Sequence, residues 1–294
     1  MRLKAIYIFA VAAALAGCSA GQRQERVITV SILPQKYLLD EIVGGHFAVE
    51  CLLANGSNPE TYEPGMEQLM ALERSEAFIG LGGRMGFERA AIERAGGEYR
   101  EMKVYDSSAG VEVARGTHGP VLGQVRGAGR HGGDDDADPH VWTSVVNAGV
   151  IAQNMLQAVV ELDPEHEDEY RSNFAALKSR LDSLHSYVGE RLKDVEPRSF
   201  IVWHPSLSYF ARDYGLVQIS MEHEGKEAPV GQMRDKIDAA RASGARIFFY
   251  QRDFDSRQIS AVNEQIGAKM VEINPMSYDW DDEIKRVADA LAAE

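Results

Sequence analysis

Three residues able to bind a metal ion stand in stiff loops or directly after predicted strands. Glu60 lies in the loop NPETYEP (58–64), where two prolines restrict the backbone just after the apolar run FAVECLL. His140 lies in DPHVW, and His204 lies in FIVWHPS. Two imidazoles and one carboxylate suit zinc and neighbouring divalent metals. Taken singly, each histidine is more often structural or exposed, so the prediction of a metal site requires that the fold bring all three together.

The elements that must position these residues are short β-rich runs separated by stretches about one helix long. The strands are predicted at 27–33, 47–53, 76–81 and 101–105, and then at 199–203, 216–221, 245–250 and 268–273. The helices are predicted at 34–43, 66–74, 87–95, 206–214, 231–242 and 256–266. Strands that alternate with helices imply parallel sheets covered on both faces, so two groups imply two α/β lobes. Ligands of such sheets bind beyond the carboxyl ends of the strands, which is where His204 follows SFIVW.

One long helix is predicted between the two lobes. Asp163 and Pro164 form a typical helix start, and Pro197 ends the segment. Apolar residues recur between them at intervals of three or four, at Tyr170, Phe174, Leu177, Leu181, Leu184, Val188 and Leu192. A helix of about 30 residues is about 45 Å long, so it can run the height of both lobes. With its apolar stripe buried, it would join the lobes stiffly.

The first residues are predicted to be a lipoprotein signal rather than a membrane span. Arg2 and Lys4 precede an apolar run of roughly 12 residues, whereas a spanning helix needs about 20. The run ends in LAGC, a lipobox whose Cys18 becomes the lipidated first residue of the mature protein. No later apolar run is expected to approach spanning length. Cys51 then remains alone, cannot form an internal disulfide, and is predicted to be a buried apolar thiol.

Charge and composition restrict the function further. The net charge of −14 argues against nucleic acid as a partner, and favours solubility and a mild attraction for cations. The segment 116–136 is rich in glycine and contains His118, His131 and three aspartates, which predicts a solvated acidic loop. The run 222–224, Glu-His-Glu, is predicted to be an exposed charged turn rather than an auxiliary cation site.

Several motifs in consistent order and spacing resemble the zinc- and manganese-binding proteins of ABC importers. The motifs are VSILPQKYLLDEIVGG, NPETYEP, DPHVW, the linker after LDPEH, WHPSLSYFARDYGL and INPM. The resemblance extends over most of the chain. It implies an α/β fold of two lobes, each with a mostly parallel sheet flanked by helices, joined by one long rigid helix. It also implies that one divalent cation is held between the lobes and handed to a membrane permease.

The resemblance further implies a ligand set of Glu60, His140, His204 and Asn274. Family members commonly have a histidine in the proline-flanked loop and an aspartate in the late motif, whereas this chain has Glu60 and Asn274. The two exchanges together leave the formal charge of the site unchanged, which favours a compensated site over a decayed one. We therefore predict zinc held by Glu60, His140 and His204, with Asn274 or water completing the shell. The alternative for Asn274 is a turn residue before proline.

Manganese is the main alternative to zinc. It favours more oxygen ligands, and Glu60 with Asn274 moves the site in that direction. Two imidazoles with one carboxylate are nevertheless a common zinc set, and zinc binds such sites more tightly than manganese, so zinc is predicted. Four aromatic residues flank the proposed ligands and either orient the imidazoles or are ordinary core packing: Tyr62, Trp142, Trp203 and Tyr209.

We predict a binding protein rather than an enzyme. The sequence contains no H-E-x-x-H, G-x-S-x-G or phosphate-loop motif, and no acid or base beyond the ligands that a metal hydrolase would need. A surface adhesin is a secondary hypothesis without a residue signature. The predicted domains are a signal peptide at 1–17, a tether at 18–26, lobes at 27–162 and 197–294, and a linker helix at 163–196. We expect a monomer on the periplasmic side of the envelope, anchored through Cys18, with an ABC permease as partner.

Overall fold

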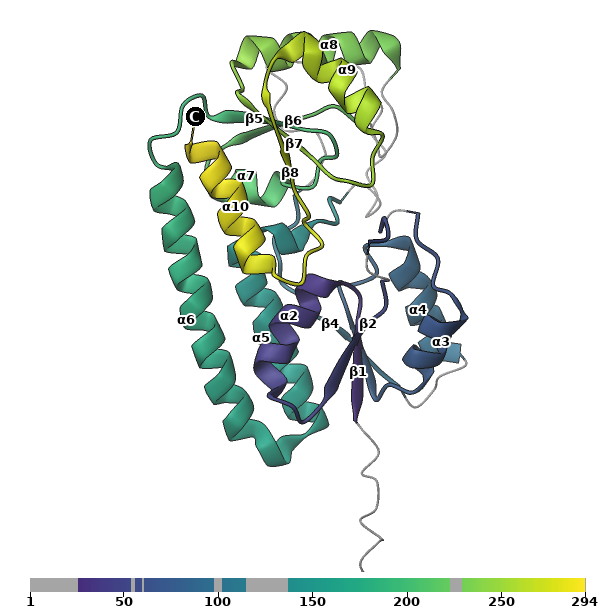
Figure 1. The fold of residues 1–294 in the computed structure, drawn as a ribbon. Coiled ribbons are helices and arrows are strands. Elements are labelled where there is room, and N and C mark those ends of the chain that lie inside the picture. Colours follow the sequence, from purple (N-terminus) through teal and green to yellow (C-terminus); the bar gives the residue numbers. More distant parts are fainter. Residues whose placement is uncertain are drawn as a thin grey trace, which may run out of the picture.

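Each half of the chain folds around four parallel strands in this computed structural model (Figure 1). The structure describes residues 26–53, 56–59, 61–97, 102–114, 137–222 and 229–293. The first sheet has the order β2-β1-β3-β4 and consists of β1 (Val27–Val30), β2 (Ala48–Cys51), β3 (Ala77–Gly80) and β4 (Lys103–Asp106). The second has the order β6-β5-β7-β8 and consists of β5 (Ser199–Val202), β6 (Val217–Ser220), β7 (Ile247–Tyr250) and β8 (Lys269–Glu272). All eight overlap the predicted strands, which confirms the fold class.

The register of the strands fixes where each strand ends, and therefore where the loops with the candidate ligands begin. In the first sheet, Ile28 of β1 pairs with Val49 of β2. In the second sheet, Val202 of β5 pairs with Ser220 of β6 and with Phe249 of β7. The inner strands β1, β3, β5 and β7 are almost wholly buried, as expected of parallel strands covered by helices on both faces.

Helices cover the two sheets. Those of the first half are α2 (Leu33–Val43), α3 (Met66–Glu73), α4 (Gly86–Gly97) and α5 (Val145–Leu162). Those of the second half are α7 (Ser208–Asp213), α8 (Val230–Ser243), α9 (Ser256–Ile266) and α10 (Trp280–Ala292). In Figure 1, α3 and α4 lie on one side of the first sheet and α2 and α5 lie on the other. Helices α5 and α10 fall outside the segments predicted to be helical.

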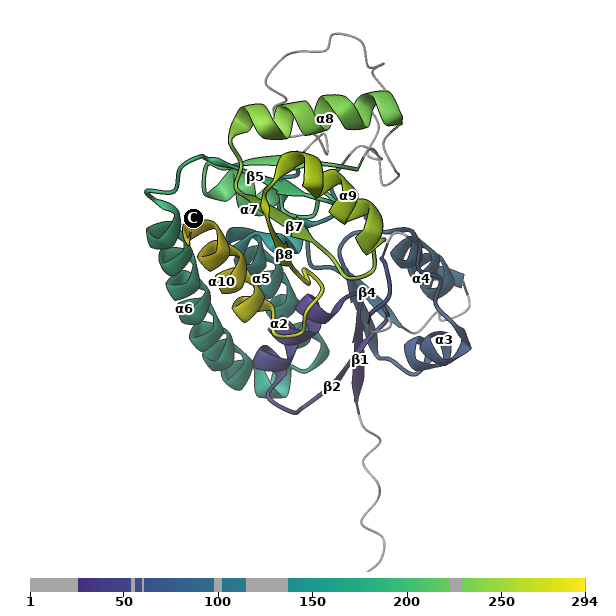
Figure 2. The ribbon, with the colours of Figure 1, turned by 45° about the horizontal axis from the view of Figure 1, so that its top comes forward.

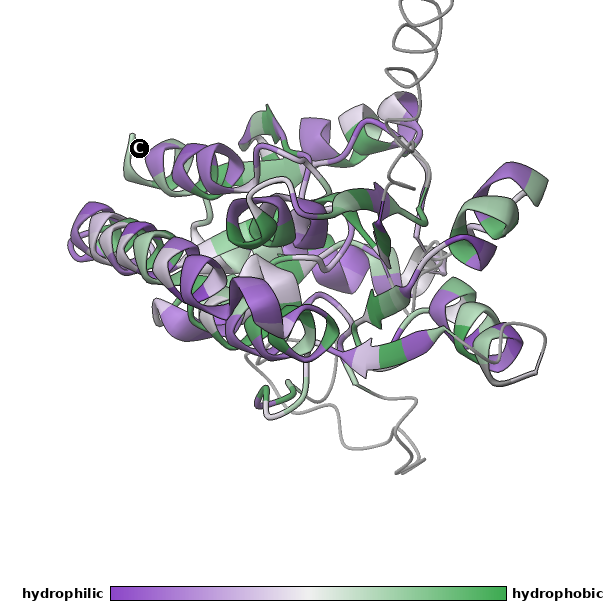
Figure 3. Ribbon diagram, turned by 90° about the horizontal axis from the view of Figure 1, so that it is seen from below, coloured by the Kyte–Doolittle hydropathy of each residue, from purple (hydrophilic) through white to green (hydrophobic). Residues whose placement is uncertain are grey.

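The long helix between the two halves is α6 (Glu167–Leu192), which confirms the predicted linker. It has 26 residues, which corresponds to about 39 Å. It begins later than predicted, because Pro164–His166 forms a separate 3-10 turn, η3. Its buried residues are Tyr170, Leu177, Leu181, Leu184, Val188 and Leu192. These are the predicted stripe except for the half-buried Phe174, and Figure 3 shows the alternation of hydrophobic and hydrophilic residues around this helix.

Helix α6 packs against α2, α5 and α10, so elements from both halves share its apolar face. Figure 2 shows α10 running beside α6 although it follows the last strand of the second sheet. One hydrophobic core therefore extends through the first half, along α6 and onto the face of the second sheet that α7 and α10 cover. A smaller cluster lies on the opposite face of the second sheet, under α8 and α9.

Two expectations about single segments are wrong. The first was that no apolar run after the signal approaches the length of a membrane span. Helix α5 has 18 residues with a mean hydropathy of 1.2, which is long and apolar enough to cross a membrane. Half of it is buried and it packs against α2 and α6, so in this fold it is a core helix. Cys51 is half-buried rather than buried, and burial raises the pKa of its thiol to about 12.

Some predicted features lie outside the described residues. These are the signal peptide, Cys18 and the loop at 116–136 with His118 and His131. The domain limits given above also stay a prediction.

Candidate metal centre

His140 and His204 meet across the boundary between the two halves. Their Nε2 atoms are 3.1 Å apart, and the rings lie edge to face with centroids 5.0 Å apart. His140 immediately precedes the 3-10 turn η2 (Val141–Thr143), and His204 lies two residues beyond the end of β5. Both are buried, with exposed fractions of 4% and 6%. The structure therefore brings together two of the predicted ligands, which are 64 residues apart in the sequence.

A carboxylate fixes the other nitrogen of each ring. Nδ1 of His140 lies 2.8 Å from Oδ1 of Asp138, and Nδ1 of His204 lies 2.6 Å from Oε2 of Glu222. An ionised carboxylate can only accept a hydrogen bond, so each Nδ1 carries a proton. The two Nε2 atoms point at each other within hydrogen-bond distance, so one ring can donate to the other. A metal ion bound by both would take the place of that proton.

The separation of the two Nε2 atoms suits zinc. Zinc bound by imidazoles at about 2.0 Å in tetrahedral geometry sets their nitrogen atoms about 3.3 Å apart. The observed distance of 3.1 Å is slightly shorter, and a small rotation of either side chain would be enough to reach the zinc spacing. The distance between the two Nε2 atoms is therefore compatible with both binding one zinc ion.

Asp138 is held in place by both its backbone and its side chain. Its Oδ1 also accepts from the backbone N–H of His140 at 2.9 Å, and its carbonyl accepts from the hydroxyl of Tyr209 at 2.7 Å. Burial alone would raise the pKa of Asp138, but the hydrogen bonds and the charge of His140 hold it below its ordinary value. The carboxylate thus stays ionised and fixes the tautomer of His140.

Glu222 corrects the prediction of an exposed charged turn at 222–224. Its exposed fraction is 5%, and its backbone carbonyl accepts from Nζ of Lys236 at 2.6 Å. His223 and Glu224 lie outside the described residues. The parallel register explains the contact: Val202 pairs with Ser220, so the residues two positions further along each strand, His204 and Glu222, also lie side by side. Knowing that β6 lies next to β5 would have been enough to predict the contact between His204 and Glu222.

The four flanking aromatic residues divide into two groups. Trp142 has its ring centroid 5.2 Å from that of His140 and donates from Nε1 to the carbonyl of Pro275 at 2.9 Å. Tyr209 reaches the site through Asp138. Tyr62 donates to the carbonyl of Leu52 and packs on a phenyl ring, while Trp203 belongs to the smaller hydrophobic cluster. Trp142 and Tyr209 therefore support the histidines, whereas the contacts described for Tyr62 and Trp203 are with other parts of the structure.

Phe254 is a neighbour that the sequence analysis missed. Its ring stacks on that of His204 with centroids 5.6 Å apart and planes 19° apart. It lies in the loop between β7 and α9, at the carboxyl end of a strand next to β5. No local motif marks it.

The two histidines line a cavity of about 420 Å³ between the halves. Asn58 and Pro59 also line it, although Glu60 itself lies outside the described residues. The proline-flanked loop thus reaches the same cavity as His140 and His204. Ligation by Glu60 stays a prediction.

Asn274 lines the same cavity but is exposed, and its side chain makes a turn contact. Its Oδ1 accepts from the backbone N–H of Met276 at 3.2 Å, and its own N–H donates to Glu283 at 2.7 Å. This is the contact that the turn interpretation expects. Ligation by Asn274 stays a prediction.

Comparison with known proteins finds the same architecture. The family model described as zinc-uptake complex component A, periplasmic, matches residues 28–292. A provisionally named metal-binding protein of Chlamydia trachomatis is 29% identical over 76% of this chain and 74% of its own length. A crystal structure of ZnuA superposes with a TM-score of 0.81 at 34% identity, covering 92% of this chain and 99% of that one. The zinc-binding protein AdcA of Streptococcus pyogenes is 22% identical over 83% of this chain, which spans about half of its length (49%).

Proposed function

The chain belongs to the family of periplasmic zinc-uptake component A proteins, and on that premise we propose that it captures a divalent cation, zinc by preference, between its two lobes. It then delivers the ion to an ABC import permease. The observation that carries this proposal is the 3.1 Å approach of the Nε2 atoms of His140 and His204, each with its Nδ1 on a buried carboxylate.

Each ligand has a separate part in the proposed shell. His140 and His204 supply two nitrogen donors that are already aligned, so little ordering is needed when the ion binds. Glu60 supplies the third donor and a negative charge from the proline-flanked loop, whose neighbours Asn58 and Pro59 line the cavity. Asn274 or a water molecule completes the shell. The second lone pair of the Asn274 amide oxygen is compatible with the hydrogen bond from Met276.

Zinc is favoured over manganese by the donor set. Zinc accepts four ligands with two imidazoles among them, whereas manganese prefers six oxygen-rich positions. The two imidazoles line the cavity, and the buried carboxylates behind them fix the orientation of each ring toward an ion. The relatives named as zinc-binding and the family's zinc-uptake description support the same choice.

A carrier rather than a hydrolase fits the polar groups of the site. Hydrolysis needs a metal-bound water and a free base beside it. Asp138 and Glu222 are both occupied by the imidazoles and are nearly inaccessible, so neither is available to activate water. We further propose that Cys18 carries a lipid anchor on the periplasmic side of the envelope, and that the protein acts as a monomer beside its permease.

The test is elemental analysis of protein purified without added metal, followed by competitive titration with zinc and manganese. We expect zinc in the purified protein and tighter binding of zinc than of manganese. His140→Gln and His204→Gln should each abolish tight binding, whereas His185→Gln on α6 should not. Preference for manganese would overturn the choice of metal, and tight binding retained in both cleft variants would overturn the site.

A further inference from the structure

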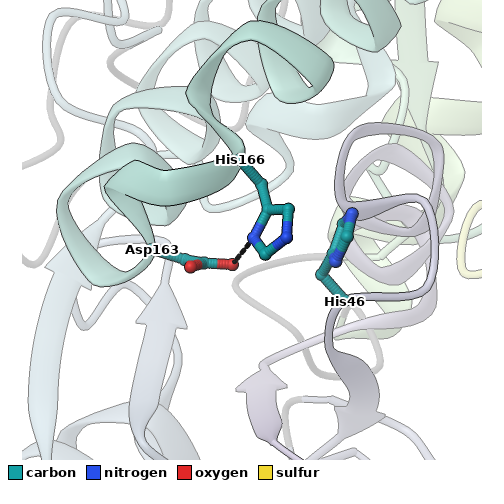
Figure 4. Close-up of side chains that lie close together, drawn as sticks. All are labelled: His46, Asp163 and His166. Atoms are coloured by element: carbon teal, nitrogen blue, oxygen red, sulfur yellow. Dashed lines mark hydrogen bonds and ion pairs between the residues drawn. The ribbon is translucent and has the colours of Figure 1, made fainter.

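A second group of metal-binding side chains lies at the far end of the first lobe from the cleft. His46 is in the turn between α2 and β2, and Asp163 and His166 lie where α5 gives way to α6. The potential ligand atoms of the three all lie within 4.8 Å of one another. Figure 4 shows the two imidazoles facing each other, with the carboxylate of Asp163 beside His166.

We propose that His46, Asp163 and His166 form a second site for a divalent ion of the zinc class, separate from the cleft and exchangeable with solvent. Two imidazoles and a carboxylate, with water in the fourth position, form a complete zinc set. The proposal rests on this cluster alone and does not depend on the function proposed for the cleft.

The hydrogen bonds of the cluster prepare it for an ion. Nδ1 of His166 lies 2.8 Å from Oδ2 of Asp163, and Nε2 of His46 lies 3.0 Å from Oε2 of Glu169. The two rings stack with centroids 3.8 Å apart and planes 28° apart. Because the lone pairs lie in the ring planes, one ring has to turn before both can bind the same ion. An ion that displaces the proton shared by His166 and Asp163 would be bound by both side chains. The distance between Nδ1 of His166 and Oδ2 of Asp163 would then have to increase by only about half an ångström, from 2.8 Å to the spacing of about 3.3 Å between ligands of a tetrahedral zinc ion.

Asp163 gives the cluster a fixed anionic anchor. The side chain is 7% exposed, and its Oδ2 accepts from the hydroxyl of Tyr170 at 2.6 Å and pairs with Arg26 at 3.2 Å. Burial alone would raise the pKa of Asp163, but the hydrogen bonds from Tyr170 and His166 and the charge of Arg26 hold it below its ordinary value. Because Arg26 shares this oxygen, an ion has to compete with a cation already present. We therefore expect weaker binding than in the cleft.

The surroundings admit an ion and attract it. His46 and His166 are 28% and 39% exposed, so an ion can reach them from solvent without any opening of the fold. The first turn of α6 adds Glu167, Asp168 and Glu169, which make the local potential negative. Both histidines lie in short turns rather than in a sheet, so their side chains can rotate to close on the ion.

Zinc binding by equilibrium dialysis of the full mature chain tests the proposal. We expect two zinc ions per chain for the natural sequence, and one for the double variant His46→Gln, His166→Gln. The double variant His140→Gln, His204→Gln should keep the second ion, which separates this proposal from the one for the cleft. His185→Gln, and the pair His118→Gln with His131→Gln, are matched controls that should keep both ions.

Two ions retained after loss of His46 and His166, or no ion bound by the double variant His140→Gln, His204→Gln, would overturn the proposal. Circular dichroism establishes whether the double variant is folded. If it is not, zinc-edge anomalous diffraction from crystals of the natural protein gives the answer instead. A peak between His46 and His166 would support the site, and a map without one there would overturn it.

Discussion

Oε2 of Glu222 lies 2.6 Å from Nδ1 of His204, and both side chains are buried. The contact joins the ends of β6 and β5, and Lys236 holds the backbone of Glu222 from α8. A residue outside the proposed metal shell thereby determines which nitrogen of His204 faces the cleft.

Glu222→Gln should weaken zinc binding by about 10-fold or more, because such carboxylate partners typically contribute 10- to 100-fold to metal affinity. The amide can still accept from Nδ1 but carries no charge to raise the basicity of the ring. Competition with a chromophoric chelator measures the change, and Glu264→Gln on the exposed face of α9 is the control. An affinity equal to that of the control would remove Glu222 from the site.

Glu60→Ala should weaken zinc binding sharply, since it removes the only charged ligand of the proposed shell. Glu63→Ala in the same loop is the matched control because it changes the loop charge equally and lies on the exposed side. Calorimetry on both variants measures the difference. Equal affinities would mean that the loop contributes general charge and that Glu60 is not a ligand.

Zinc affinity should fall as pH decreases from about 8 to 5, because zinc and protons compete for the same nitrogen atoms of histidine ligands, a side chain that titrates at about 6.5 in model peptides. The lowered pKa of Asp138 keeps that carboxylate ionised throughout this range, so its titration adds nothing to the slope. Well below the histidine pKa, the affinity should change by up to about 100-fold per pH unit, one factor of ten for each ring. A flat profile would argue against His140 and His204 both being ligands.

Leu181→Asp should destabilise both lobes together, because Leu181 is 4% exposed in the stripe of α6 that elements of both lobes cover. Loss of a buried leucine and burial of a carboxylate cost about 3–5 kcal/mol. Thermal unfolding should remain a single transition at lower temperature, and Ala176→Asp on the exposed face of α6 should change it little. Two separate transitions would mean that the lobes are independent.

The sequence predicts the strands and the position of His204 because these depend on local patterns. Each of the eight strands is a short apolar run between helix-length segments, and a residue just after such a run must lie at a carboxyl edge of a sheet. The contact between Asp138 and His140 could also have been predicted, since Asp138 stands two residues before His140 in the same motif.

Other parts of the site depend on which strands are neighbours. Glu222 reaches His204 only because β6 lies next to β5, and Phe254 reaches it only because β7 lies on the other side. The sheet order 6-5-7-8 is a property of the whole fold, so a polar residue beyond β6 cannot be told from a solvated turn by its own sequence. For the same reason, nothing local to Trp280 indicates that its indole donates to the carbonyl of Trp142 at 2.9 Å.

The path of α10 joins the two halves of the structure. This last helix returns from the second sheet to pack on α6 beside α2, and Tyr278 just before it donates to Asp40 of α2 at 2.9 Å. The packing of α2, α6 and α10 and the hydrophobic core that they share thus join the two halves. Among the described residues, no extended strand crosses between the halves where it could act as a hinge. For an ion bound as proposed, we therefore expect release to need only a local movement of residues that line the cavity, such as the turn after β7, rather than a rotation of one half against the other.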